Sequence, residues 1–456
     1  MKTYSMKLRF AYILALAILM LALPALAESS GKYLDDLELP QITPGKSISL
    51  QEALRLADSR NLTLAEIKTG IMQSQELLRS SWGTLLPDVY GGINYTYNDH
   101  EDTSNVGGQS IISRKQQDLD AQLSVSLPLI NARQWLNISS SKANLEVSRL
   151  NFEEARQMLL YSVAQAYYQA LTANSLIEVY KNQIEATRRH LAVATVRYRS
   201  GVGNRLDVTR YQSDLLSTRE ELIKAHYAFD NSRDALGTLI RVKGLPTPSG
   251  EIKMPATYTT SNDDLLENAM TQRFDLRAAK KSLSLSDKQR KESYMQFVPS
   301  LNASWQLSYQ ISDPAQDGTD RSRWFAGLVL SVPLFDFNFY PQIDQSKISK
   351  RQAEISLQQT EDNAQLEVRQ ARRNYEQALE LVRSGTSKTS IVEESLELAE
   401  TYYKQGSGSS LDVSDARKTL QNAQVNLAIK KLDVQLSYLY LMRVTGEDLK
   451  NTFGGK

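Results

Sequence analysis

The sequence predicts a mainly α-helical fold with four β-strands, built from two copies of one structural repeat. Two stretches 205 residues apart carry the repeat: YRSGVGNRLDV at 198–208 and YKQGSGSSLDV at 403–413. Each follows a long proline-free run in which apolar residues recur at steps of three and four, which is typical of helices. Each run follows two segments of alternating polarity, which is typical of strands. An internal repeat of this kind determines the architecture of a chain.

The N-terminus has the features of an export signal. Lys2, Lys7 and Arg9 precede an apolar run at 10–23, and Ala25-Leu26-Ala27 forms a small-x-small cleavage site. We therefore expect residues 1–27 to be a signal peptide. Without its three basic residues the chain has a net charge of −2 instead of +1. Such a balance does not suit nucleic acid as a partner, because nucleic-acid binding needs a basic face.

Two absences narrow the class of protein further. The chain has no cysteine, so an exported protein of this kind holds itself together by packing or assembly rather than by disulfides. No segment after residue 27 reaches 18 consecutive apolar residues, so we expect no membrane-spanning helix. If the chain enters a membrane, it must therefore do so as β-strands.

The predicted elements follow the same order in two halves, residues 28–245 and 246–456. The first half has a helix over 50–85 that starts at Ser49, strands at 88–98 and 118–129 with a polar loop between them, a helix over 129–200 and a return helix over 206–242. The second half has a helix over 262–297, strands at 300–311 and 323–334, a helix over 342–405 and a return helix over 411–443. Pro128 and Pro333 end equivalent strands, again 205 residues apart.

The strands combine an apolar face with a polar face. In the third strand, Leu301, Ala303, Trp305, Leu307, Tyr309 and Ile311 alternate with Asn302, Ser304, Gln306, Ser308 and Gln310. This pattern with aromatic residues is typical of membrane β-barrels. A soluble coiled coil decorated with hairpins is the alternative, but it leaves the export signal and the strand pattern unexplained.

Four strands are too few to close a barrel, and open sheet edges are not tolerated in lipid. Several copies of the chain must therefore contribute strands to one barrel. Two copies would build a barrel of about eight strands and three copies a barrel of about twelve.

The order of elements resembles that of the TolC-like outer-membrane efflux channels. Short stretches are similar to that family as well: LQEAL at 50–54, LP at 86–87, SLPL at 126–129 and SVPLF at 331–335. The resemblance covers essentially the whole chain after residue 27. It implies a homotrimer in the outer membrane of a Gram-negative bacterium, with a barrel of about twelve strands. Long antiparallel helices are implied to form a periplasmic α-barrel.

The same resemblance implies a function. Such a trimer is the passive exit duct of a tripartite efflux or type I secretion system, gated at its periplasmic tip. Its partners are a periplasmic adaptor protein, an inner-membrane transporter and outer-membrane lipid. The cargo and the class of transporter stay open. The alternative is a periplasm-spanning structural or adhesion protein without a conducting pore.

No residue pattern points to an enzyme, a cofactor or a metal. The three histidines, His100, His190 and His226, have neither metal-ligand nor triad spacing. The stretch Gly201-Val202-Gly203 lacks the third glycine and the preceding strand of a nucleotide-binding loop. We therefore expect no catalytic residue.

Acidic residues just past the glycine turns are the best candidates for a functional site. Asp207, Asp412 and Asp415 lie in the first turn of the return helices. Helix capping is the simplest interpretation, because Asn204 with Asp207, and Ser409 with Asp412, have the spacing of a capping box. Asp412 and Asp415 also share a helix face, and in a trimer they would place carboxylates around one axis. Carboxylate rings select cations.

The resemblance implies that Asp207, Tyr403, Asp412 and Asp415 form the periplasmic gate. The best-known member of the family has an arginine where this chain has Gly408, and whether Arg205 replaces it stays open. The turn glycines, Gly201, Gly203, Gly406 and Gly408, are expected to keep the tip small for adaptor docking. They are equally expected as helix C-caps.

Overall fold

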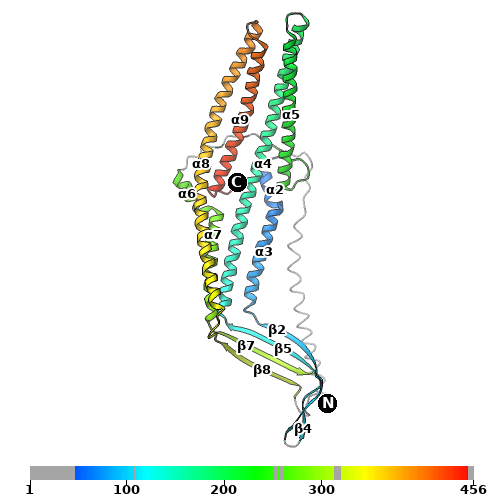
Figure 1. Ribbon diagram of the computed structural model, residues 1–456, viewed down its shortest axis with the longest axis vertical. Helices are drawn as coiled ribbons and strands as arrows, with labels where there is room; N and C mark the ends of the chain where they lie inside the picture. Colours follow the sequence, from blue (N-terminus) through cyan, green and yellow to red (C-terminus); the bar gives the residue numbers. More distant parts are fainter. Residues whose placement is uncertain are drawn as a thin grey trace.

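The molecule is elongated, with long helices at one end and a sheet at the other (Figure 1). The computed structural model describes residues 47–106, 109–250, 252, 255, 261–312 and 320–449. The signal peptide expected at residues 1–27 lies outside this part of the chain. None of the described helices contains a stretch that is both long and apolar enough to cross a membrane.

The described residues form the following elements. The helices are α2 (Leu50–Arg60), α3 (Leu62–Gly83), α4 (Ala132–Arg199), α5 (Arg205–Ile240), α6 (Asn262–Gln272), α7 (Phe274–Tyr294), the short 3₁₀ helix η2 (Met295–Phe297), α8 (Phe339–Gln405) and α9 (Ser410–Val444). The strands are β1 (Ser47–Ile48), β2 (Asp88–Tyr97), β3 (Asp102–Val106), β4 (Gln109–Arg114), β5 (Gln117–Ile130), β6 (Thr247–Pro248), β7 (Ser300–Gln310) and β8 (Ser322–Ser331).

Two very long helices run the length of the helical part. Helix α4 has 68 residues and α8 has 67, so each is about 100 Å long at 1.5 Å per residue. Toward the tip, α4 packs against α5 and α8 against α9, while α3 and α7 pack along the halves nearer the sheet (Figure 1). Gly385 does not interrupt α8, because it is buried where the side chains of Lys430 and Leu427 pass close to its backbone.

Two expected helices are each divided in two, and both single-helix predictions were wrong. Asn61 separates α2 from α3, because its side chain accepts hydrogen bonds from the Thr63 and Leu64 amides and donates one to the Leu239 carbonyl at 3.0 Å. Arg273 separates α6 from α7. Its extended backbone lets the guanidinium bind Asp275 at 2.7 Å and Glu367 of α8 at 2.8 Å.

The expected loop over 98–117 contains a second hairpin, formed by β3 and β4. This hairpin projects beyond the four-stranded sheet (Figure 1). The prediction missed it because polar residues dominate both strands, so no apolar face marks them.

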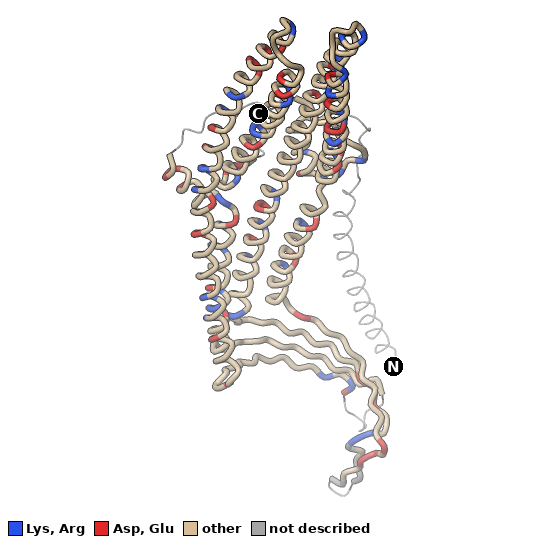
Figure 2. Tube along the Cα trace, turned by 45° about the horizontal axis from the view of Figure 1, so that its top comes forward, with Lys and Arg blue, Asp and Glu red and all other residues tan. Residues whose placement is uncertain are grey.

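The main sheet has the antiparallel order β2-β5-β7-β8 and joins the two halves through β5 and β7. Its register aligns the apolar positions, since Val125 lies between Val89 and Trp305, and Trp305 lies opposite Ala326. One face of the sheet is therefore apolar across all four strands. Figure 2 shows few charged residues on the sheet and many on the helices.

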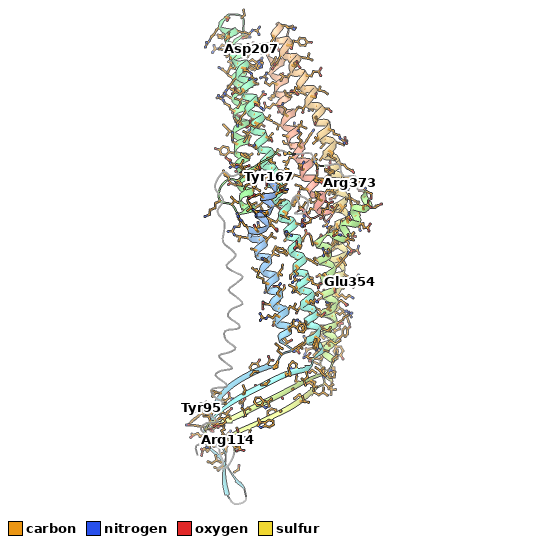
Figure 3. The ribbon with its side chains drawn as sticks, turned by 180° about the vertical axis from the view of Figure 1, so that it is seen from behind. Tyr95, Arg114, Tyr167, Asp207, Glu354 and Arg373 are labelled. Atoms are coloured by element: carbon orange, nitrogen blue, oxygen red, sulfur yellow. The ribbon has the colours of Figure 1, made fainter. Side chains whose placement is uncertain are left out.

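The buried core lies in the middle of the helical part. One apolar cluster joins α2, α4, α5 and α9, and a second joins α6, α8 and α9. The hydroxyl of Tyr167, labelled in Figure 3, lies within hydrogen-bond distance of the carbonyls of Ile48 in β1 and of Ser249 directly after β6. The core thus holds the boundary between the two halves against α4.

Candidate functional site at the helical tip

The tip is built from two tight turns, one between α4 and α5 and one between α8 and α9. Gly201 and Gly406 have φ values of +77° and +82°, a conformation that side chains with a Cβ disfavour. Gly203 is required for another reason, since a Cβ there would lie 2.8 Å from the Tyr198 backbone nitrogen. Turn geometry alone therefore accounts for glycine at these positions.

Asp412 caps its own helix. Its carboxylate accepts hydrogen bonds from the Ser409 amide at 2.9 Å and hydroxyl at 2.8 Å, and the Ser409 hydroxyl accepts from the Asp412 amide. This is a complete capping box, as expected. The bonds from Ser409 lower the pKa of the exposed Asp412 carboxyl. Asp412 therefore stays ionised at neutral pH.

Asp207 does not form the expected box. Asn204 caps α5 by accepting from the Leu206 amide instead. The Asp207 carboxylate, labelled at the tip in Figure 3, accepts a hydrogen bond from the Ser410 hydroxyl at the start of α9. Arg210 binds the same Ser410 oxygen at 2.8 Å and lies 3.8 Å from Asp207. Asp207 thus ties one hairpin to the other.

Further contacts join the two hairpins close to the tip. The Arg197 guanidinium of α4 lies 5.0 Å from the centre of the Tyr403 ring of α8, a favourable cation–π geometry. The Ser414 hydroxyl of α9 donates to Asp214 of α5 at 2.6 Å. The structure therefore places Asp207 and Tyr403 in the same inter-hairpin seam.

Asp415 and Arg205 lie outside this seam, and both are exposed. Within one chain, the arginines next to Asp207 and Tyr403 are Arg210 and Arg197 rather than Arg205. Asp412 and Asp415 therefore remain at the exposed surface of α9.

A buried polar cluster lies deeper in the seam, and sequence reasoning missed it. Arg417 of α9 donates to Glu400 of α8 and to the His190 imidazole of α4, both at 2.5 Å. The His190 ring stacks on Tyr211 of α5, with ring centroids 5.8 Å apart. Each residue comes from a different helix, so no spacing in the sequence marks the group.

The cluster is strongly buried and incompletely bonded. Tyr211 is 2% exposed and Arg417 6% exposed. The Tyr211 hydroxyl and the Nε and Nη1 atoms of Arg417 have no hydrogen-bond partner in the described part of the chain. Burial raises the pKa of Tyr211 to about 12 and lowers the pKa of His190, which the Arg417 charge lowers further. His190 is therefore neutral at pH 7.

The described residues contain no group of three or more side chains suited to hold a metal ion. A family model of outer membrane efflux proteins matches residues 53–240 and 265–447, one segment in each half of the chain. The chain belongs to the outer membrane efflux protein family. Members of this family are channels of the Gram-negative outer membrane that extend into the periplasm, rather than enzymes.

Individual relatives agree with this membership. Outer membrane protein TolC of Vibrio cholerae is 23% identical over 81% of this chain and 84% of its own length. Alkaline protease secretion protein AprF of Pseudomonas aeruginosa is 23% identical over 77% of this chain and 76% of its own length. Cation efflux system protein CusC of Escherichia coli is 20% identical over 80% of this chain and 78% of its own length. A solved CusC structure superimposes with a TM-score of 0.76 at 17% identity, covering 90% of this chain and 96% of that one. The mainly helical, TolC-like fold is thereby confirmed.

Proposed function

We propose that three copies of this chain form the exit duct of a tripartite efflux or type I secretion system. Membership of the outer membrane efflux protein family supports the duct. The open sheet of one chain supports assembly from several copies, and this observation carries the proposal furthest. The number three follows the resemblance to the TolC-like channels.

Strands β2 and β8 are the two edges of the four-stranded sheet. All ten residues of β2 are exposed, and so are all but one of β8. An apolar sheet with two unpaired edges is not tolerated in lipid. If β2 of one copy pairs with β8 of the next, three copies close a barrel of about twelve strands with the apolar face outward.

The helical part supports the same assembly. Near the tip each chain contributes α4, α5, α8 and α9, so three chains would surround the axis with a tunnel of twelve helices. The halves 28–245 and 246–456 then act as two equivalent repeats around that axis. A periplasmic adaptor would dock on the turns at Gly201, Gly203, Gly406 and Gly408, and an inner-membrane transporter would complete the system.

The gate is assigned to the tip. Contacts of Asp207 and Tyr403 would hold the hairpins together in the closed state, while Asp412 and Asp415 would line the narrowest point. Relatives named for protease secretion and for cation efflux share this family. We therefore propose that the inner-membrane transporter, rather than this channel, selects the cargo.

Planar-bilayer recording with purified trimers tests the duct. We expect a small cation-preferring current. Asp415→Asn should reduce the cation preference, and because the Asp415 carboxylate is outside the capping box, the helix start should stay intact. Glu393→Gln, an exposed change on α8 away from the tip, is the matched control. A silent bilayer from intact, inserted trimers would favour the non-conducting scaffold instead.

A further inference from the structure

The buried cluster formed by His190, Tyr211, Glu400 and Arg417 lies in the seam that must open if the tip is a gate. We propose that it is a proton-sensitive latch, in which protonation of His190 releases Arg417 and lets the two hairpins separate. This inference rests on the proposed function of the tip.

The geometry makes the His190–Arg417 contact depend on a neutral imidazole. The Nη2 atom of Arg417 lies 2.5 Å from His190 Nε2. Arginine can only donate hydrogen bonds, so Nε2 must carry a lone pair to accept. An added proton on Nε2 would replace the acceptor by a donor and place two positive charges in contact.

The charged and titratable groups around His190 determine which contact its protonation weakens. The groups that face it are Arg189 on its own helix, Tyr211 on α5, Glu400 on α8 and Arg417 on α9. Glu400 lies on the same hairpin as Arg417 and is bonded to it at 2.5 Å, closer than its 3.3 Å from His190 Nε2. After protonation, the repulsion between His190 and Arg417 therefore acts across the seam between the two hairpins.

Arg417 is incompletely bonded in the closed seam and lies beside a polar cavity. A polar cavity of about 360 Å³ adjoins the cluster between α4, α5 and α9. Its lining includes Arg417 itself and the acidic residues Asp214, Glu220 and Glu221. The Nε and Nη1 atoms of Arg417 have no partner in the closed seam, so separation of the hairpins exposes them to water without breaking a bond that they make.

The sign of the pH effect follows from linkage. Burial and Arg417 lower the pKa of His190 in the closed seam relative to its ordinary value of 6.5. The open form therefore binds the proton more tightly, and opening becomes more favourable as the pH falls below about 6.5. At pH 5.5 the opening equilibrium shifts by up to about tenfold per subunit.

Bilayer currents of intact trimers at pH 7.5 and 5.5 test the latch. We expect the open probability to rise reversibly at pH 5.5 in the natural protein, by up to about tenfold for each subunit whose hairpins must separate. His190→Gln cannot take up a proton and should abolish the rise. His226→Gln, an exposed histidine of α5, is the matched control and should keep it. A current that falls or stays constant on acidification, or a rise that persists in His190→Gln, overturns the latch.

A second measurement does not depend on conduction. The chain has no cysteine, so spin labels can be placed uniquely at Arg199→Cys and Lys404→Cys, two exposed positions at the ends of α4 and α8. We expect the distance between labels to lengthen at pH 5.5, and not in the His190→Gln background. A distance change in trimers that carry no current would keep the latch and reject the duct. An unchanged distance would reject the latch.

Discussion

Ser410, the first residue of α9, donates a hydrogen bond to the carboxylate of Asp207 in the first turn of α5, although the residues are 203 positions apart. The starts of the two return helices are thereby joined within one chain. Arg210 and Asp214 of α5 add bonds to Ser410 and Ser414 of α9 along the same seam. If the hairpins separate during gating, these bonds must break first.

Asp207→Ala should therefore favour the open channel. The substitution removes the acceptor for Ser410 and the charge beside Arg210. A charge-assisted hydrogen bond at a partly exposed site contributes about 1 kcal/mol, so the open-to-closed ratio should rise about fivefold per subunit. Single-channel recording measures this ratio.

Glu178→Ala is the control for that experiment. It removes a carboxylate from an exposed ion pair with Lys181 on α4, and exposed pairs contribute little. Equal currents from Asp207→Ala and the natural protein would show that the seam does not limit opening.

A lysine on the apolar face of the sheet should block assembly in the membrane. Leu328 lies opposite Ala303 on that face, and a lysine near the middle of a barrel strand costs about 2–4 kcal/mol on the lipid side. Leu328→Lys should reduce the amount of inserted, heat-stable trimer on a gel.

Ser304→Lys carries the same charge on the opposite face of the sheet, next to Gly327. We expect normal trimer from it, because this face would line the water-filled interior. Similar loss from both variants would contradict the assignment of lipid and interior faces.

Asn61 should be important for stability, since it performs two tasks at the break between α2 and α3. Asn61→Ala loses the cap of α3 and the bond to the Leu239 carbonyl of α5. We expect a loss of about 2 kcal/mol in the free energy of unfolding. Asn61→Ser keeps a capping oxygen without placing a carboxylate against the Leu239 carbonyl, and it should lose less. Urea unfolding followed by circular dichroism compares the two, and equal losses would reject the capping contribution.

Gly203→Ala should loosen the tip. An added Cβ would lie 2.8 Å from a backbone nitrogen, so the turn has to shift. Faster trypsin cleavage after Arg199 or Arg205 reports this change. Gly70→Ala in α3 meets no atom within 4 Å and should instead stabilise its helix by about 0.5–1 kcal/mol. Unchanged cleavage in Gly203→Ala would show that the turn tolerates a side chain.

Much of the fold could be predicted because its signals are local. Helices end before Pro87 and Pro299, strand residues alternate in polarity, and glycines form the turns. Each of these features depends only on neighbours in the chain. The breaks at Asn61 and Arg273 could not be predicted in this way. They depend on Leu239 and Glu367, which lie on distant segments.

In the candidate site too, contacts between neighbours in the chain could be predicted and contacts between distant residues could not. The Ser409–Asp412 box is local, and its spacing predicted it. The role of Asp207 was predicted less well, because its partner Ser410 belongs to the other half. The cluster around Arg417 was missed entirely, since its four residues come from four helices.

By itself, the sequence determined the duplicated order of helices and strands, the faces of the strands and the position of both turns, because periodicity and backbone preferences act over a few residues. Only the tertiary structure decided that β5 lies beside β7 and that α5 lies beside α9 near the tip. Those pairings place Asp207 against Ser410 and bury His190 with Arg417. The pairing energy comes from contacts between residues far apart in the chain, which no local pattern records.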